Sequence, residues 1–336
     1  MKKAFFYTIT VIVLLTVTGG KGICQSRMTM TMTTAPNTLE VKMRLSGTDS
    51  VTVDWGDGKK NNFITSNAYD KCSGRDFSSC SHTYSDTSTH IITIIGKNIN
   101  ILHCSDNQLI KLDVSKNTAL EELYCYHNQL TNLDVSNNTK LKYLHCYKNF
   151  LTKLNVGGCS DLQTLRCRDN LLTNLDITKN IALTTLDCKR NKLISLDVTN
   201  CTKLWDLGCQ SNYLSSLDIS KNILLERLHC YDNQLISLDI RTNTALTVLD
   251  CAGNQLTNLD IGKNIKLYLL NCDRNNFSEK ALNALFVSLH NKRVIYNYEK
   301  SVYIYGNPGT NSCDKSIAEK KKWKVVIRKG KNHTNG

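Results

Sequence analysis

Leucine, cysteine and asparagine recur every 21 residues through the middle of the chain. Each cysteine of the series follows a leucine by two residues and precedes an asparagine by three. The nine cysteines are Cys104, Cys125, Cys146, Cys167, Cys188, Cys209, Cys230, Cys251 and Cys272. In one unit, Leu123 and Cys125 point to one side of a short strand, and Tyr124 and Tyr126 point to the other. A single unit cannot enclose its own apolar side, so the period predicts a solenoid with one long parallel sheet.

The asparagines form two columns at the same period. The first column starts at Asn107 and ends at Asn275, and we expect its amides to bond backbone groups where the chain leaves each strand. The second column lies in the other half of each unit and contains Asn117, Asn138, Cys159, Asn180, Cys201, Asn222, Asn243 and Asn264. Cysteine therefore replaces asparagine twice in the second column and nowhere in the first.

The unit Leu-x-x-Leu-x-Cys-x-x-Asn-x-Leu resembles the leucine-rich repeat. With Leu-Asp-Val-Ser-x-Asn in its second half, it is similar to the internalin-like surface proteins of Bacteroides-type bacteria, although it is one residue shorter than the familiar internalin unit. The resemblance covers residues 99–277 and implies an α/β to mainly β fold. About nine repeats would form the leucine-rich repeat solenoid, with an N-terminal β-sandwich cap and an α/β C-terminal cap.

The two ends of the chain depart from the repeat. Residues 27–98 alternate apolar and polar positions at 39–45, 51–53 and 90–95, which predicts strands. Asp54-Trp55-Gly56-Asp57-Gly58 and His82-Thr83-Tyr84 resemble a PKD-like domain, and the aspartates fit a turn better than a calcium loop. Residues 278–336 predict an α/β cap with a basic tail: a helix from Ser278 to about His290, strands at 293–298 and 302–305, a helix at 313–322 and a strand at 323–327.

The first 26 residues have the layout of an export signal. Two lysines precede an apolar run from Ala4 to Thr18, which is shorter than the ~18–20 residues that span a bilayer. We therefore expect an exported protein that is periplasmic, surface-attached or secreted, with no membrane span in the mature chain. A retained membrane anchor and a lipid anchor at Cys24 stay open as alternatives, although Lys21 and Ile23 depart from the lipoprotein pattern.

Charge and motifs exclude several functions. The net charge is +13, but lysines of the leader and of residues 279–336 supply most of it, so the body lacks the basic face of a nucleic-acid-binding protein. None of the Gly-x-Ser-x-Gly, His-Glu-x-x-His, P-loop or dinucleotide-binding patterns occurs, and we expect neither an enzyme nor a cofactor.

The cysteines of the repeat are expected to be buried thiols. Neighbouring parallel strands lie ~4.8 Å apart, and a disulfide needs a closer, twisted pair. A straight row without Cys-x-x-Cys also does not suit a tetrahedral metal, so no metal site is expected. Cys72 and Cys80 flank a polar loop and are either a disulfide or two free thiols, and Cys313 has no evident partner.

The outward side chains of the predicted sheet are the candidate site. The positions directly before and after each cysteine combine aromatic and basic side chains, which are enriched at binding hot spots. The candidates on this concave face are Tyr124, Tyr126, His145, Tyr147, Arg166, Arg168, Asp187, Lys189, His229 and Tyr231. We expect a monomeric module that binds a protein or a glycan; the alternative is a structural or adhesive envelope protein without a specific ligand.

Overall fold

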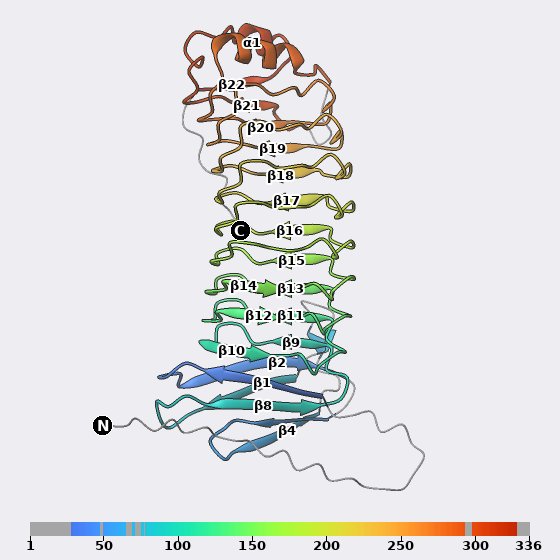
Figure 1. Ribbon diagram of the computed structural model, residues 1–336, viewed down its shortest axis with the longest axis vertical. Helices are drawn as coiled ribbons and strands as arrows, with labels where there is room; N and C mark the ends of the chain where they lie inside the picture. Colours follow the sequence, from blue (N-terminus) through green and yellow to red (C-terminus); the bar gives the residue numbers. More distant parts are fainter. Residues whose placement is uncertain are drawn as a thin grey trace, which may run out of the picture.

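A stack of short parallel strands forms the body of the protein (Figure 1). The computed structural model describes residues 28–47, 50–64, 69–70, 75–76, 78–292 and 298–327. Eleven strands run parallel in one sheet: β9 (Ile101–His103), β11 (Glu122–Tyr124), β13 (Tyr143–His145), β15 (Thr164–Arg166), β16 (Thr185–Asp187), β17 (Asp206–Gly208), β18 (Arg227–His229), β19 (Val248–Asp250), β20 (Leu269–Asn271), β21 (Ser301–Tyr303) and β22 (Lys324–Val326). We call each of these strands a rung. The predicted solenoid and its long parallel sheet are confirmed.

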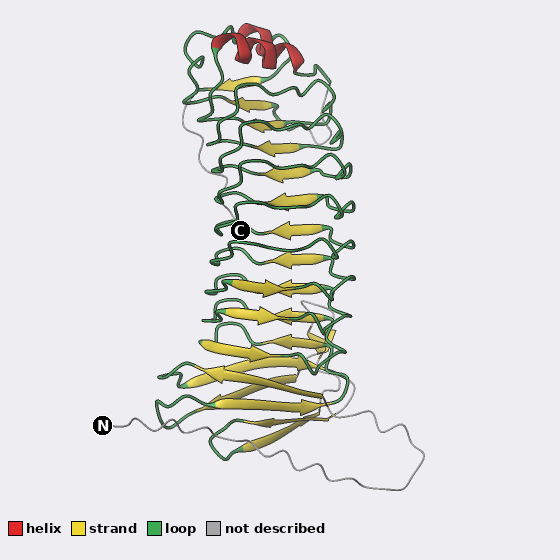
Figure 2. Cartoon of the chain, in the orientation of Figure 1, coloured by secondary structure: helices red, strands yellow, loops and turns green. Residues whose placement is uncertain are grey.

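The rungs stand in strict register because the leucines coincide. Leu123 of β11 pairs with Leu102 of β9 on one side and with Leu144 of β13 on the other. All nine cysteines of the repeat have no exposed surface, so they face inward as predicted. The returning arms carry β10 (Leu109–Asp113) and the parallel pair β12 (Asn132–Asp134) and β14 (Lys153–Asn155), and they continue mostly as turns (Figure 2).

The N-terminal segment joins the first coil on both of its arms. Its strands are β1 (Met28–Thr34), β2 (Glu40–Ser46), β3 (Ser50–Asp54), β4 (Lys60–Ile64), β7 (Ser78–Thr83) and β8 (Ile91–Gly96), with β5 (Tyr69–Asp70) and β6 (Arg75–Asp76) as a separate pair. Strand β1 pairs antiparallel with β10, and β2 pairs antiparallel with β9. One sheet of the segment therefore has the order β10-β1-β8-β3-β4, whereas β2 and β7 extend the long sheet beyond its first rung.

The aspartate turn and the His-x-Tyr motif of this segment meet in space. The Asp57 carboxylate lies 2.8 Å from His82 Nε2, and the His82 ring stacks on Trp55. The Tyr84 hydroxyl donates a hydrogen bond to the carbonyl of Trp55. Asp54 and Asp57 also accept hydrogen bonds from the backbone of their own turn, at Gly56 and Lys59. These contacts give the aspartates the turn-forming role that their spacing predicted.

The first asparagine column ties each coil to the one before it. Asn170 donates from Nδ2 to the carbonyls of Cys146 and Cys167, and its Oδ1 accepts from the Leu151 amide at 2.9 Å. The same three bonds recur at the successive asparagines from Asn149 to Asn275. The amide therefore satisfies buried backbone groups of two coils at once, which would otherwise cost free energy.

The second column uses only its donor side. Asn222 donates from Nδ2 to the carbonyls of Val198 and Cys201, and its buried Oδ1 has no hydrogen-bond partner among the described residues. At position 201 the thiol lies against the equivalent carbonyls, with Sγ 3.8 Å from Ile177 O and 3.7 Å from Asn180 O. A thiol can thus replace an amide in this column because no acceptor is required there.

The C-terminal segment continues the solenoid around an inserted helix. Helix α1 (Glu279–Ser288) begins after Ser278, whose side chain accepts from the Ala281 amide, as expected from the sequence. Asn307 then repeats the bonds of the first column, with Nδ2 donating to Cys272 O and Ile304 O. Strand β21 is therefore a further rung, set apart by the insertion that contains α1.

The second predicted helix is shorter than its pattern suggested. Helix α2 spans Ser316–Glu319, whereas residues 313–322 were expected to be helical. The residues before α2 form a turn after Asn307 instead, in which the Cys313 amide donates a hydrogen bond to the Gly309 carbonyl. At the other end, Lys322 adopts a φ of 62°, which ends the helix. The expected strand at 293–298 lies almost entirely outside the described residues.

One hydrophobic core runs through the whole structure. Buried side chains from Met30 in β1 to Trp323 next to β22 belong to a single cluster. The leader, Cys24, Cys72 and the tail from residue 328 lie outside the described residues. The division of the chain at residues 26, 98 and 277 stays a prediction.

Candidate binding surface

The outward positions of the rungs form one continuous surface, which we call the sheet face. It comprises the residues directly before and directly after each cysteine of the repeat. Five of the ten predicted site residues end their strands, namely Tyr124, His145, Arg166, Asp187 and His229, and the other five follow two positions later, namely Tyr126, Tyr147, Arg168, Lys189 and Tyr231. The alternation of the strand therefore places all ten on the side opposite to the buried cysteines.

Aromatic side chains stack along the N-terminal half of the sheet face. The rings of Tyr126 and Tyr147 lie parallel with centroids 4.6 Å apart, and the Arg168 guanidinium lies 4.6 Å above the Tyr147 centroid. In the neighbouring column, Tyr124 stacks on His103 and meets the His145 ring edge to face. Stacking leaves these tyrosines half-buried, so a firm amphipathic surface is already ordered without a partner.

Some charged side chains in this half of the sheet face contact one another. Arg168 Nε lies 3.6 Å from the Asp187 carboxylate, and burial raises the pKa of Asp187 against the lowering effect of Lys189 and Arg168. Burial, together with Arg166, His103 and Arg168, lowers the pKa of His145 to about 4. His145 is therefore neutral at pH 7. The positive charge of this half at that pH comes from Arg166, Arg168 and Lys189.

The sheet face extends onto the N-terminal segment, which the sequence analysis missed. Because β2 and β7 join the long sheet, Arg44 stands opposite His103 and also pairs with Ser79. A cavity of about 480 Å³ opens at this junction. Its lining comprises Lys42, Met43, Arg44, Ser79, Cys80, Ser81, His103, Ser105, Asp106 and Tyr126. The alternation of Glu40, Lys42 and Arg44 with buried residues signalled a strand, but not the sheet that it would join.

A third outward column was also missed. The residues two positions before the strand ends point outward too, and among them Arg227 pairs with Asp206 at 2.6 Å. The Arg227 guanidinium also lies 4.7 Å from the ring centroid of Trp205. The period-two alternation could have revealed this column, because positions three before each cysteine share the side of the strand that carries Tyr124.

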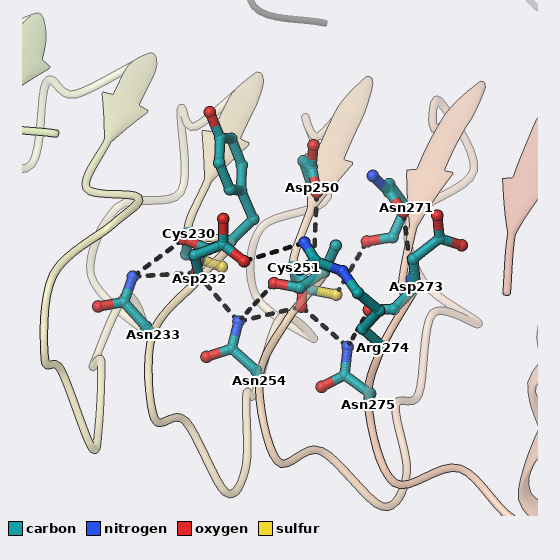
Figure 3. A network of polar contacts seen from close by, with 12 residues as sticks. Cys230, Asp232, Asn233, Asp250, Cys251, Asn254, Asn271, Asp273, Arg274 and Asn275 are labelled. Carbon is teal, nitrogen blue, oxygen red and sulfur yellow. Dashed lines mark hydrogen bonds and ion pairs between the residues drawn. The ribbon is translucent and has the colours of Figure 1, made fainter. Parts of the chain in front are cut away.

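His229 and Tyr231 lie apart from the aromatic half. The rung of Gly208 and Gln210 separates them from Asp187 and Lys189. The next two rungs carry the acidic side chains of Asp250 and Asp273 (Figure 3). Asp250 is buried, and burial raises its pKa to about 6 although the Ala252 amide donates to its carboxylate. Asp273, also buried, accepts from the Tyr305 amide at 2.6 Å. The face is thus basic and aromatic toward β9 and acidic toward β20.

An ion pair skips one rung in this acidic half. Arg274 Nη2 lies 2.9 Å from Asp232 Oδ1 (Figure 3). Gly253 occupies the intervening position. Gly253 has a φ of 61°, which matches the left-handed backbone of residues such as His127 and Lys148 at the same place in other units. Because Gly253 has no side chain, the ion pair between Asp232 and Arg274 can form across this position.

Replacing Gly253 by alanine is expected to destabilise the protein by about 1 kcal/mol. A Cβ at this position would press against Asp232 Oδ1 and displace it from Arg274. Urea unfolding of Gly253→Ala, with Gly253→Ala/Asp232→Ala beside it, measures the effect. Most of the loss should disappear in the Asp232→Ala background; an equal loss in both backgrounds would show that backbone strain alone is responsible.

The buried thiols of the repeat have low chemical reactivity. No disulfide joins any two of the thirteen cysteines among the described residues, and burial raises the pKa of the Cys104, Cys146 and Cys209 thiols to about 12. Thiols held in this protonated form are poor nucleophiles and metal ligands. Cys80 is buried, but Cys72 lies outside the described residues, so the pairing of these two stays a prediction. Cys313 contacts the Thr310 carbonyl through Sγ at 3.5 Å.

Comparison with known proteins agrees with this geometry. The family model for leucine-rich repeats (two copies) matches residues 118–158, within the in-register rungs. The chain folds as a leucine-rich repeat solenoid. Among solved structures, the functional domain of InlJ from Listeria monocytogenes, described as including a cysteine ladder, is 34% identical with a TM-score of 0.59. The alignment covers 69% of this chain and 50% of that one, so the leucine-rich repeat chain spans half the length of the InlJ domain.

Two further solved structures are more distant. An internalin, InlF, also from Listeria monocytogenes, is 17% identical over 70% of this chain and 88% of its own, with a TM-score of 0.40. A plant peptide hormone receptor, RGFR1 in complex with RGF2, is 21% identical over 64% of this chain and 40% of its own, with a TM-score of 0.48. The comparison with curated proteins found no match.

The leucine-rich repeat solenoid is typical of protein-binding modules, and proteins of this class are generally non-enzymatic scaffolds. Within the described ranges, no group of three or more histidine, cysteine or acidic side chains is placed to hold a metal ion. The helices of the same ranges are too short or too polar to cross a membrane.

Proposed function

We propose that the protein is an exported binding module that recognises a partner protein with the aromatic half of its sheet face, from β9 to β16. The observation that carries the proposal is the stack of Tyr126, Tyr147 and Arg168, held on in-register strands. Tyrosine and arginine contribute most to binding where their order is fixed before the partner arrives. A glycan is the alternative ligand, since stacked aromatic rings and charged groups suit both.

The remaining parts of the proposal rest on the sequence. The leader pattern at residues 1–26 supports export to the periplasm, the cell surface or the medium. The Asp57–His82 and Trp55–Tyr84 contacts support a PKD-like N-terminal cap, and the 21-residue unit supports an origin among Bacteroides-type bacteria. The segments at both ends of the solenoid depart from the regular repeat, which supports a monomer.

Replacing Tyr126, Tyr147 and Arg168 together by alanine is expected to abolish partner binding and leave the melting temperature nearly unchanged. These side chains are outside the buried core, so their loss removes contact area without opening a cavity. Pull-down from whole cells and a glycan array, each with wild-type protein and the triple variant, measure the effect and separate the two ligand classes.

The matched control replaces Tyr213, Ile236 and Arg241, which are exposed outside the sheet face. This variant should bind as the wild type does. Undiminished binding by the sheet-face variant, or its loss of folding, would contradict the proposal. No specific ligand in either screen would favour a structural role in the cell envelope.

A further inference from the structure

We propose that the cavity between β2, β7 and β9 is an anion subsite that takes a carboxylate side chain from an acidic peptide segment of the partner. This inference rests on the proposed function, because the cavity opens beside the aromatic half of the sheet face. His103 and Tyr126 belong both to the cavity lining and to the stacked columns.

Positive charge and hydroxyl groups converge on the cavity. Arg44 is exposed and makes no ion pair with any described residue, so its guanidinium is available for two parallel bonds to a carboxylate. Lys42 lies beside it and shares its charge with Glu40 at 2.7 Å. The Ser105 hydroxyl in the lining is buried and has no hydrogen-bond partner among the described residues. An entering carboxylate would supply the acceptor that this hydroxyl lacks.

The acidic side chain in the lining is already engaged. Asp106 lies 3.2 Å from Nδ1 of His127. Its carboxylate therefore faces a histidine of the next unit, and Arg44 is the charged side chain of the lining that has no ion pair among the described residues. The balance of the lining favours an anion over a cation.

The backbone of the site is held in place before any ligand binds. Asn107 accepts from the Lys42 amide at 2.7 Å and donates to the Lys42 carbonyl at 2.6 Å. This residue starts the first asparagine column, so the edge of the cavity is tied to the whole solenoid. A preformed site loses little conformational freedom on binding.

The length of the basic surface favours a peptide. From β2, the order β9, β11, β13, β15 and β16 leads to Arg166, Arg168 and Lys189. Five strand spacings of ~4.8 Å make roughly 24 Å, which is the length of about seven extended residues. A peptide across the rungs could place one carboxylate at Arg44 and another at Arg166, with Tyr126 and Tyr147 beneath its middle.

The test uses a labelled peptide of about seven residues that alternates glutamate and alanine, and the same peptide with glutamine in place of glutamate. Fluorescence anisotropy at low ionic strength should show binding of the glutamate peptide only. Arg44→Gln should raise its Kd about tenfold, and Arg241→Gln, which removes the same charge outside the sheet face, should change it less than about twofold. Equal effects of the two variants, or no binding to the wild type, would overturn the inference.

Free glucuronate distinguishes the other source of a carboxylate. If glucuronate binds in an Arg44-dependent manner and the peptide does not, the cavity belongs to an acidic sugar and the peptide assignment is wrong. If Arg44→Gln captures the cellular partner normally while the Tyr126/Tyr147/Arg168 variant loses it, only this inference fails. If the triple variant retains the partner, the proposed function fails whatever the peptide does.

Discussion

Replacing Asn170 by alanine is expected to lower the free energy of unfolding by about 3 kcal/mol, because the buried Leu151 amide loses its partner and two buried carbonyls each lose one of their two hydrogen bonds. The Leu151 amide and the carbonyls of Cys146 and Cys167 are all bonded by this one side chain. Asn170 also lies in the middle of the stack, so the coils on either side should lose part of their coupling. Urea unfolding should show both a lower midpoint and a smaller dependence of the unfolding free energy on urea concentration.

The matched control is Asn222→Cys in the second column. The thiol can donate to either of the two carbonyls that Asn222 now bonds, and the buried Oδ1 that it removes has no partner among the described residues. We therefore expect a loss below about 1 kcal/mol. A cost of that small size for Asn170→Ala, or equal costs at the two positions, would show that the first column does not hold the coils together.

The different hydrogen bonding of the two asparagine columns explains why cysteine replaces asparagine in only one of them. Cysteine occupies positions 159 and 201 of the second column, but every unit keeps asparagine in the first. The first column needs a side chain that both donates and accepts, and the second needs a donor alone. The spacing could therefore predict both columns, but only the hydrogen bonds show why one tolerates a thiol.

The 21-residue period predicted the structural features that neighbouring coils determine. It could not predict contacts between segments that are far apart in the sequence. Strand side, inward cysteines and the ten outward candidates all follow from the 21-residue register. The pairing of β2 with β9 joins residues about 60 positions apart and belongs to no repeat, so the cavity at Arg44 and Ser105 could not be predicted. Asn307 was missed for a related reason, since the insertion containing α1 breaks the spacing although Val302-x-Ile304-x-x-Asn307 keeps the motif.

Replacing Asp250 by asparagine is expected to stabilise the protein at pH 7 by about 2 kcal/mol and to change little at pH 4. Burial raises the pKa of Asp250 from 3.8 in the unfolded chain to about 6 in the native state. The native state therefore binds this proton more tightly, and its stability falls as the pH rises from about 4 to about 6 and stays lower above that range. Asparagine has no charge to bury, so urea unfolding between pH 4 and pH 7 should show the gain developing across this window.

Asp239→Asn is the control with the opposite sign. Its carboxylate is exposed, and hydrogen bonds from Arg241 lower its pKa to about 2, so its loss should not stabilise the protein at pH 7. A gain at Asp250 that is absent at Asp239 would assign the effect to burial. Equal gains would indicate a general effect of removing negative charge, and no gain at pH 7 would contradict the raised pKa.

The protonation of His145 should change the free energy of unfolding over nearly the same pH range as that of Asp250, but with the opposite sign. The pKa of His145 is lowered from 6.5 to about 4, so the native state resists protonation and loses stability as the pH falls through this range. In the wild type, the gain at Asp250 on acidification partly offsets the loss at His145. Asp250→Asn should therefore show a steeper acid-side fall than the wild type, and His145→Gln in that background should flatten it. Parallel profiles of all three proteins would contradict the placement of Asp250 in a buried position and of His145 in a half-buried position of the sheet face.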